Sequence, residues 1–219
     1  KPKTLSLKES MIMGTAGFTA LQCSFTTKTT REELLLGEKV QNVIVSGASG
    51  GVGSMAVMIL NKLGCEVTAV TGKDSNKDFL KSIGAKNVVN TSELIKDSRP
   101  LDKGLWDGAV DTVGGKVLEN ILSQTKDAGI VAACGNAADI KLNTTVMPFI
   151  IRGVKLWGIN SVNASIKRRQ FLWNEAGKLL DFETLGKSVK EINLEEVIDI
   201  YPKMLKGETS GRYIINLDK

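Results

Sequence analysis

Apolar segments that are typical of buried strands alternate with helical patterns from residue 42 to residue 160. Strands are expected at 42–47, 65–70, 86–90, 109–111, 129–135 and 153–160, and the clearest helices between them at 54–63, 74–83 and 116–124. This alternation is typical of a parallel sheet that is covered by helices on both faces. Because crossovers between parallel strands are right-handed, it predicts an α/β, doubly wound Rossmann-type domain with about six strands.

A glycine-rich stretch, VSGASGGVGSMAV, joins the first strand to the first helix and runs from Val45 to Val57. Ala48, Gly50 and Gly53 occupy the three positions of the dinucleotide-binding fingerprint G-x-G-x-x-G, with alanine at the first. The first position is expected to form the tight turn, the second to admit a pyrophosphate, and the third to let the helix pack on the sheet. The N-terminus of that helix then offers unpaired N–H groups to the phosphates. A purely structural turn is the alternative.

Two other interpretations of this loop are excluded by residues that the chain lacks. A Walker-type phosphate loop needs Gly-Lys-Ser/Thr, which is absent from the stretch. The segment from Ser46 to Gly53 also matches the short-chain dehydrogenase pattern, but those enzymes need a tyrosine with a lysine four residues later. The tyrosines of this chain, Tyr201 and Tyr213, have leucines at that spacing. The required acid–base pair is therefore missing.

The end of the second expected strand bears on the choice between NAD and NADP. An NAD site usually places an acidic residue there, which bonds the ribose 2′-hydroxyl. Here Gly72 leaves room for a 2′-phosphate, and Lys73, with Ser75 or Lys77, could contact it. Asp74 is the competing acidic candidate, although it lies past the strand and could cap the next helix. These residues favour NADP.

Composition excludes several other classes of function. The chain has no histidine, so Ser-His-Asp catalysis and histidine-ligated metal are excluded, and Cys23, Cys65 and Cys134 are too widely spaced for a disulfide framework or a zinc site. The net charge of +5 suits a phosphate-bearing ligand, but the basic residues are scattered. The one short cluster, 167–169, is expected to be a solvated helix face, so no nucleic-acid partner is predicted. No apolar run approaches the roughly 18 residues of a membrane span and no signal peptide is visible, so we expect no membrane association and a cytoplasmic location.

Stretches along nearly the whole chain, in order, resemble the medium-chain dehydrogenase/reductases. They are GTAGFTA (14–20), the glycine-rich stretch, KLGCEVTAVTGK (62–73), LKSIGAKNVVN (80–90), GAVDTVGG (108–115), VAACGNA (131–137), TTVMPFIIRGVKLWGINS (144–161) and GRYIINL (211–217). The combination is most similar to the zinc-independent quinone oxidoreductase branch, and within it to the acryloyl-CoA reductase-like group. Zinc-dependent members have a cysteine ligand where this chain has Thr15, which cannot replace a thiolate on catalytic zinc. No metal is therefore expected.

The resemblance also implies which residues contact the cofactor, NADP(H). Thr19 matches a threonine near the nicotinamide, the loops 111–115 and 134–137 match segments that line the ribose and nicotinamide, and 158–161 matches the wall near the carboxamide. Arg212 matches an arginine that often reaches the cofactor phosphates, with a solvated surface position as the alternative. The expected cofactor-binding residues are Thr19, Ala48, Ser49, Gly50, Gly51, Val52, Gly53, Gly72, Lys73, Ser75, Lys77, Thr112, Val113, Gly135, Asn136, Gly158, Asn160 and Arg212.

The domain organisation implied by the resemblance has three parts. Residues 1–13 would be the end of a catalytic domain or a linker, 14–161 the NADP-binding Rossmann domain, and 162–219 the C-terminal segment of the catalytic domain. In family members an N-terminal, largely β domain precedes this region and supplies most substrate contacts and the candidate proton donors. We therefore expect the catalytic residues outside this chain, and weak or no activity from these 219 residues alone.

The implied reaction is hydride transfer from NADPH to a small-molecule substrate. The acceptor would be an electron-poor alkene, such as an enoyl thioester of the acryloyl-CoA type, or a quinone. The alternative is a non-catalytic NADPH-binding sensor or regulatory protein of the same fold. The resemblance further implies a homodimer that forms through the sixth strand, 154–159.

Overall fold

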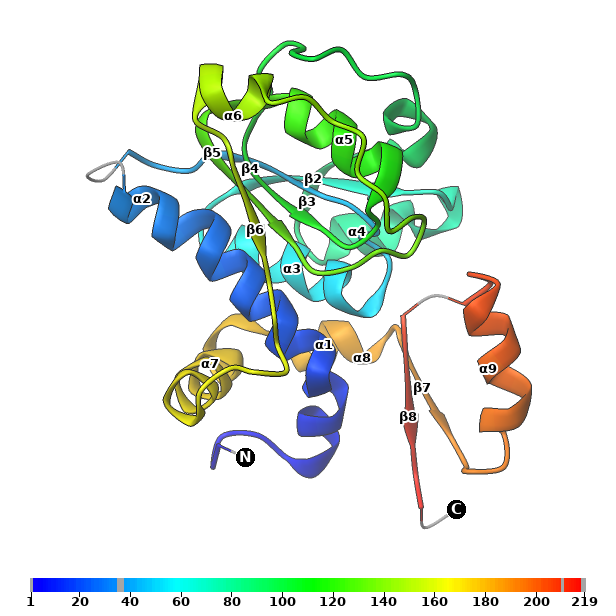
Figure 1. Ribbon diagram of the computed structural model, residues 1–219. Coiled ribbons are helices and arrows are strands. Elements are labelled where there is room, and N and C mark those ends of the chain that lie inside the picture. Colours follow the sequence, from blue (N-terminus) through cyan, green and yellow to red (C-terminus); the bar gives the residue numbers. More distant parts are fainter. Residues whose placement is uncertain (1, 35–37, 210, 218–219) are drawn as a thin grey trace.

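The computed structural model describes residues 2–34, 38–209 and 211–217. Its helices and strands, labelled in Figure 1, follow one another along the chain. They are α1 (Leu7–Phe25), α2 (Arg31–Leu34), β1 (Asn42–Val45), α3 (Gly51–Lys62), β2 (Glu66–Thr71), α4 (Lys77–Ser82), β3 (Ala85–Asn90), β4 (Trp106–Asp111), α5 (Gly115–Ser123), β5 (Thr125–Ala133), α6 (Met147–Arg152), β6 (Lys155–Gly158), α7 (Ile166–Leu179), α8 (Phe182–Gly186), β7 (Val189–Ile192), α9 (Val197–Leu205) and β8 (Arg212–Ile215).

Strands β1 to β6 form one parallel sheet in the order β3-β2-β1-β4-β5-β6. Helices α1 and α3 cover one face of this sheet, and α5 and α6 cover the other (Figure 1). The direction of winding reverses between β1 and β4, which is the arrangement of a doubly wound fold. The predicted Rossmann-type architecture is confirmed.

The side chains of β1 explain why its sequence is a continuous apolar run. Val43 and Val45 join the core cluster on the face of α1 and α3, which includes Met55, whereas Ile44 joins the cluster on the opposite face, which includes Ile121. Successive residues of a strand point to opposite faces, and both faces are buried here. Each fully buried branched side chain contributes about 1.5–3 kcal/mol, so both faces must be apolar for the central strand to be stable.

Helix α1 reaches the sheet through a kink and a close contact with α3. At Gly14 the backbone leaves the helical conformation, with φ 45° and ψ −152°. Three residues later, a Cβ on Gly17 would lie 2.6 Å from Cγ of Met13 and 2.8 Å from Sδ of Met55. A glycine is therefore needed at this point for α1 and α3 to approach each other.

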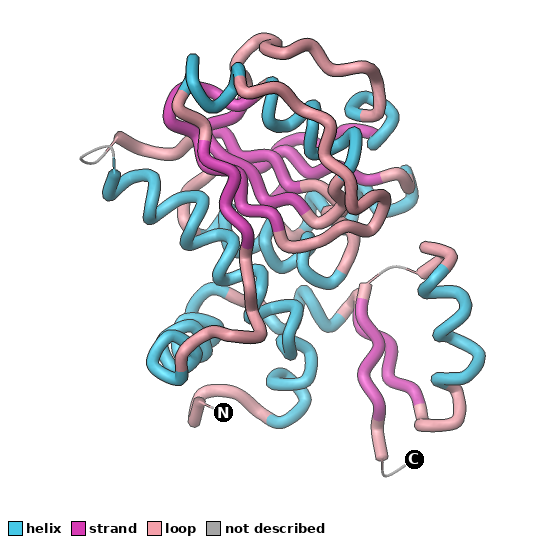
Figure 2. Tube along the Cα trace, in the orientation of Figure 1, coloured by secondary structure: helices cyan, strands magenta, loops and turns pink. Residues whose placement is uncertain are grey.

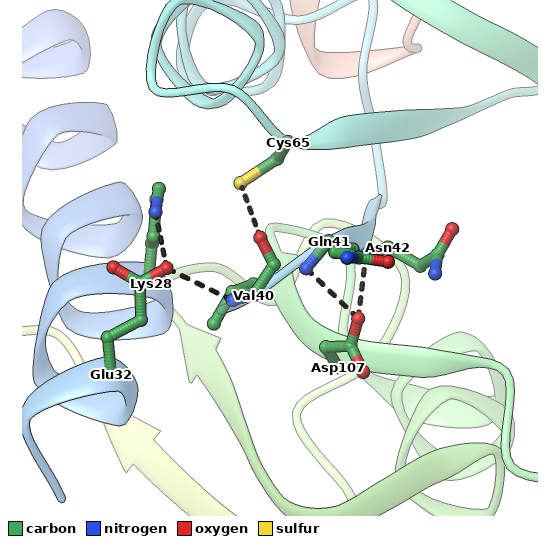
Figure 3. Close-up of polar contacts among 7 residues, drawn as sticks. All are labelled: Lys28, Glu32, Val40, Gln41, Asn42, Cys65 and Asp107. Atoms are coloured by element: carbon green, nitrogen blue, oxygen red, sulfur yellow. Dashed lines mark hydrogen bonds and ion pairs between the residues drawn. The ribbon is translucent and has the colours of Figure 1, made fainter. Parts of the chain in front are cut away.

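The end of the sheet that is opposite to the glycine-rich loop is fixed by Asp107 of β4 (Figure 3). Its Oδ2 accepts hydrogen bonds from the backbone N–H groups of Gln41 (3.1 Å) and Asn42 (2.8 Å), and its Oδ1 pairs with Nζ of Lys126 at 3.1 Å. Burial alone would raise the pKa of Asp107, but the hydrogen bonds and Lys126 outweigh it and lower that pKa below its usual value. Asp107 thus holds the start of β1 against β4.

The C-terminal region forms a second, smaller unit. Strands β7 and β8 pair in parallel, apart from the six-stranded sheet, and α9 lies beside them (Figure 2). Residues Arg212–Ile215 form β8, the last strand of the described chain. Its partner β7 and the short helices α6 and α8 were not predicted. Helix α9 begins at Val197, and Oδ1 of Asn193 accepts the N–H of Glu196 at 2.9 Å in the turn that precedes it.

The cluster 167–169 is only partly the solvated face that the sequence predicted. Lys167 and Arg168 are exposed, but Arg169 turns inward. Its guanidinium lies 4.9 Å from the ring centre of Phe18 and donates to the carbonyl oxygens of Ser161 and Val162, both at 2.9 Å. This arginine therefore joins α7 to α1.

No helix within the described part of the chain is long and apolar enough to cross a membrane.

Candidate functional site

The loops that follow β1, β2, β4 and β5 meet at one edge of the sheet because parallel strands share their carboxyl ends. β1 pairs with β2 on one side and with β4 on the other, so the crevice between the β1 and β4 loops is the point where the winding reverses. Ligands of open α/β sheets bind at such a point. The glycine-rich stretch is the loop that follows β1.

The tight turn of the glycine-rich loop is made by Gly47, whereas the fingerprint predicted it at Ala48. Gly47 has φ +57°, and a Cβ there would lie 2.2 Å from Oγ1 of Thr112, so only glycine fits. Ala48 is fully buried and its N–H donates to the carbonyl of Val70 at 2.9 Å. Ala48 therefore lies beneath the surface of the loop, and its own side chain faces the core.

Helix α3 begins at Gly51, three residues earlier than predicted, and Gly50 is its N-cap. Among the described residues no side-chain hydrogen bond caps this N-terminus, so its first N–H groups are open to an anion. A Cβ on Gly53 would lie 2.3 Å from the carbonyl oxygen of Gly47 and 2.7 Å from Cα of Ala48. The third glycine thus lets the helix pack directly against the loop, as the fingerprint predicts.

A buried polar network that was not predicted from the sequence joins the β1 and β4 loops. The hydroxyl of Ser46 donates to Oδ1 of Asp111 at 2.6 Å and accepts the N–H of Thr112 at 3.0 Å. Oδ2 of Asp111 accepts the N–H of Gly114 at 2.9 Å. Burial raises the pKa of Asp111 above its usual value, although these hydrogen bonds oppose the shift. The sequence signal that could have predicted this network is the pair of polar residues, Ser46 and Asp111, at the ends of two apolar strands. The network holds the β1 and β4 loops in fixed positions relative to each other.

Arg212, at the start of β8, reaches the glycine-rich loop from the C-terminal unit. A Cβ on Gly51 would lie 3.0 Å from its Nη1, and one on Gly14 would lie 3.2 Å from its Nη2. The N–H of Gly211 donates to the carbonyl of Ser49 at 3.3 Å, which ties the same segment to the loop. The side chain is largely buried, which argues against a solvated surface arginine, and burial lowers the pKa of its guanidinium.

The guanidinium of Arg212 is not fully satisfied by the described residues. Its Nε is buried and has no hydrogen-bond partner in the part of the chain that the structure describes. It lies beside the open N-terminus of α3, where the helix dipole already contributes positive charge. Two positive groups without a counter-charge favour a bound anion between them.

The residues that follow β2 have several partners within the chain. Nζ of Lys73 donates to the carbonyl oxygens of Gly207 (2.7 Å) and Thr209 (2.9 Å). Lys77 pairs with Asp74 at 3.1 Å, and this contact lowers the pKa of Asp74. Asp74 therefore does not cap α4, whose N-cap is Asn76, and it lies beyond the end of β2.

Two further positions after β2 remain open. Gly72 and Ser75 are exposed, and the nearest described atom to a Cβ on Gly72 would be Oγ1 of Thr91, at 3.7 Å. There is therefore free space beside Gly72, as the sequence predicted for a 2′-phosphate.

The remaining predicted residues lie in α1 and in the loops that follow β4, β5 and β6. Thr19 is buried in α1 and its hydroxyl donates to the carbonyl of Thr15 at 2.8 Å. A Cβ on Gly135 would lie 2.4 Å from the carbonyl oxygen of Thr112, so the β4 and β5 loops are in contact. Val113 is half-buried, whereas Asn136, Gly158 and Asn160 are exposed. Oδ1 of Asn160 accepts the N–H groups of Val162 and Asn163, which fixes the turn after β6.

No group of three or more His, Cys, Asp or Glu side chains gathers in a way that could hold a metal ion among residues 2–34, 38–209 and 211–217. Cys23 and Cys134 lie close enough that a hydrogen bond between their thiols raises the pKa of Cys23 and lowers that of Cys134. Cys134 immediately precedes Gly135 at the edge of the crevice.

Comparison with known proteins agrees with this geometry. Residues 51–176 match the family described as zinc-binding dehydrogenase. Over 99% of its length the chain is 42% identical to the probable acrylyl-CoA reductase AcuI of Escherichia coli (strain K12) and 39% identical to the putative quinone oxidoreductase YhfP of Bacillus subtilis (strain 168). In both cases it spans 65% of the relative's length.

Solved structures of relatives superpose closely on the chain. The yhdH oxidoreductase of Salmonella enterica, solved in complex with NADP, has a TM-score of 0.92 at 42% identity. The yhfP protein of Bacillus subtilis, solved with NAD bound, has a TM-score of 0.89 at 38% identity. Each match covers 99% of this chain and 65% of the relative. The chain therefore belongs to the zinc-binding dehydrogenase family, and within the medium-chain dehydrogenase/reductase superfamily it lies in the zinc-independent branch of the quinone oxidoreductases and acrylyl-CoA reductases.

Proposed function

We propose that this chain is the dinucleotide-binding part of an NADPH-dependent reductase. The observation that carries the proposal is the largely buried guanidinium of Arg212, whose Nε has no partner among the described residues and which lies against Gly51 at the uncapped N-terminus of α3. An unpaired cation and open helical N–H groups together fit the pyrophosphate of a dinucleotide. The NADP-bound structure of the Salmonella relative supports the same assignment.

When bound, NADPH supplies the hydride, and the protein binds and orients it. Gly50 to Gly53 and Arg212 would hold the pyrophosphate, and Gly47 would keep the loop close to Thr112. The network of Ser46 and Asp111 positions these two loops. Thr19 and the loop 134–137 would lie along the nicotinamide, where they orient the ring and exclude water.

We favour NADPH over NADH because of the residues that follow β2. Gly72 leaves open space, and Lys73, Ser75 and Lys77 would surround a 2′-phosphate there. Lys73 has already committed two of its three N–H donors to carbonyl oxygens, so one donor remains for a phosphate. NADH is the competing cofactor, because the Bacillus subtilis relative was solved with NAD bound.

The substrate that we propose is an electron-poor alkene of the enoyl thioester class, such as acryloyl-CoA, or a quinone. The names of the Escherichia coli and Bacillus subtilis relatives support these two classes. In this proposal residues 14–161 form the cofactor domain, while residues 1–13 and 162–219 belong with the substrate domain. The exposed apolar side chains of Leu194, Ile198, Leu205 and Ile215 in the C-terminal unit support a surface that a further part of the protein covers.

A homodimer through β6 is also proposed. β6 is the edge strand of the sheet, and Leu156 and Trp157 on it are partly exposed. An exposed apolar edge strand is suited to pairing with a second copy. Sedimentation of the full-length protein tests this, and a monomer at micromolar concentration would contradict it.

The function is tested by measuring NADPH oxidation by the full-length protein with acryloyl-CoA, crotonyl-CoA and a quinone. We expect turnover with at least one of the three acceptors. Tight NADPH binding without turnover on any of them would instead support a non-catalytic NADPH sensor. Substantial turnover by these 219 residues alone would contradict the proposal that the substrate domain lies largely outside this chain.

A further inference from the structure

The segment that connects α9 to β8 is attached to the nucleotide-binding domain at two places. Nζ of Lys73, in the loop after β2, donates to the carbonyl oxygens of Gly207 and Thr209 at 2.7 and 2.9 Å. The N–H of Gly211 donates to the carbonyl of Ser49 in the glycine-rich loop at 3.3 Å. Both attachments join residues that lie far apart in the sequence, so the position of this segment depends on them.

The residue that follows this connection, Arg212 at the start of β8, carries the guanidinium that faces the glycine-rich loop. Arg212 follows Gly211 directly, and its side chain lies against Gly14 and Gly51. On the side of its own unit, the N–H of Arg212 donates to the carbonyl of Ser188 at 3.1 Å. Nε of Arg212 is buried and makes no hydrogen bond with the described residues. The location of the guanidinium is therefore set by its packing, by the pairing of β8 with β7, and by the attachments of the backbone that precedes it.

Lys73 contributes the shorter and charge-assisted attachments. A lysine ammonium that donates to two carbonyl oxygens forms stronger hydrogen bonds than the 3.3 Å contact between Gly211 and Ser49. The hydrogen bonds of Gly207 and Glu208 within their own unit go back to α9, at Met204 and Lys203, and do not reach the sheet domain. Loss of the Lys73 ammonium would leave the segment attached to the cofactor domain mainly through the weaker contact.

We propose that Lys73 is a positioning residue for the pyrophosphate site. Through Gly207 and Thr209 it holds the end of the connection between α9 and β8, so that Arg212 lies at the N-terminus of α3. This role deepens the proposed function and rests on it. It differs from a contact between Lys73 and the 2′-phosphate, because it affects every dinucleotide that has a pyrophosphate, whether or not a 2′-phosphate is present.

The test compares ligands with and without the 2′-phosphate. Binding of NADPH, NADH and ADP-ribose to the full-length protein is measured by isothermal titration for the unchanged protein and for Lys73→Met, which keeps the length of the side chain and removes its donors. We expect Lys73→Met to weaken NADH and ADP-ribose roughly tenfold, the equivalent of about 1.4 kcal/mol, and NADPH at least as much. Lys178→Met, at an exposed lysine of α7 that pairs with Glu175, is the matched control and is expected to leave all three affinities within about twofold.

Two further variants separate positioning from a general structural effect. Lys73→Arg keeps donors that can reach two carbonyl oxygens and is expected to retain NADH affinity within about threefold. In an Arg212→Gln background, Lys73→Met is expected to cause little further loss of NADH, because the group that Lys73 positions is already absent.

The outcomes distinguish this inference from the proposed function. If Lys73→Met weakens NADPH alone, or if its effect on NADH adds fully to that of Arg212→Gln, then Lys73 does not position Arg212 and the inference is overturned while dinucleotide binding stands. If the unchanged full-length protein binds none of the three ligands, the proposed function itself is overturned.

Discussion

Replacement of Gly53 by alanine tests the packing that forms the phosphate loop. Gly53 lies in the first turn of α3, and an added Cβ would meet three backbone atoms of Gly47 and Ala48 at 2.3–2.8 Å. Ordinary contacts of a Cβ begin at 3.4 Å, so the helix and the loop would have to separate by roughly 1 Å. Since these atoms are backbone, no flexible side chain can move aside.

The free-energy cost of Gly53→Ala results from two opposing effects. Overpacking of a close contact costs about 1–3 kcal/mol, and the rigid backbone neighbours favour the upper end of that range. Alanine in place of glycine in a helix recovers about 1 kcal/mol. We therefore expect a net loss of about 2 kcal/mol in the free energy of unfolding. For a cooperative unit of roughly 150–250 residues, that corresponds to a decrease in Tm of roughly 4–8 °C, and a larger cooperative unit in the full-length protein would show a smaller decrease.

The assay is thermal unfolding of the full-length protein, followed by circular dichroism, with Gly186→Ala as the control. A Cβ on Gly186, in α8, would meet nothing within 4 Å, and its backbone has no left-handed φ. The control variant is expected to unfold at the original Tm or slightly above it. If Gly53→Ala unfolds within about 1 °C of the unchanged protein, the close approach of α3 to the loop is not as described and the reasoning fails.

Three other predictions concern the crevice and the opposite end of the sheet. A Cβ on Gly50 would lie 3.2 Å from the nearest backbone oxygen, so Gly50→Ala should lower Tm little but weaken NADPH binding at least tenfold, as measured by titration; unchanged affinity would contradict a pyrophosphate at this position. Because the folded state lowers the pKa of Asp107, Asp107→Asn should lower the free energy of unfolding in urea by about 1–3 kcal/mol at pH 7. The difference in stability between the two proteins should shrink as the pH falls below 3.8 towards the pKa of the folded state. A difference in stability that grows in acid would contradict the pairing with Lys126. Iodoacetamide should modify Cys134 before the buried Cys23, and NADPH should slow that reaction, as read by peptide mass spectrometry; early labelling of Cys23 would contradict the assigned burial and pKa order.

The six-stranded sheet was predictable because each of its strands is either an apolar run or begins after a glycine that ends a helix. Val43, Ile44 and Val45 are buried on both faces, which leaves a continuous apolar signal in the sequence. β7 could not be found in this way. Its four residues, Val189–Ile192, have the sequence VKEI, which is neither an apolar run nor an apolar–polar alternation. β7 depends on pairing with β8, more than twenty residues later.

The candidate site was predictable where chemistry is encoded locally. The spacing of Gly50 and Gly53 after a strand predicted the loop, and the structure moves the tight turn from Ala48 to Gly47 and the start of the helix from residue 54 to Gly51. The hydrogen bonds of Lys73 could not be predicted, because their acceptors are carbonyl oxygens 134 and 136 residues away and any residue type supplies a carbonyl. The location of Arg212 beside the loop depended likewise on the folded C-terminal unit.

The most direct measurement of the central claim is a titration of NADPH into the full-length protein and into its Arg212→Gln variant. If the glycine-rich loop and Arg212 together hold the pyrophosphate, NADPH binds saturably to the unchanged protein. Loss of a charged hydrogen-bond donor of about 1.5–3 kcal/mol then weakens NADPH and NADH by similar factors, roughly 10- to 150-fold. Absence of saturable binding, or equal affinity in the two proteins, would contradict the assignment of this crevice as a dinucleotide site.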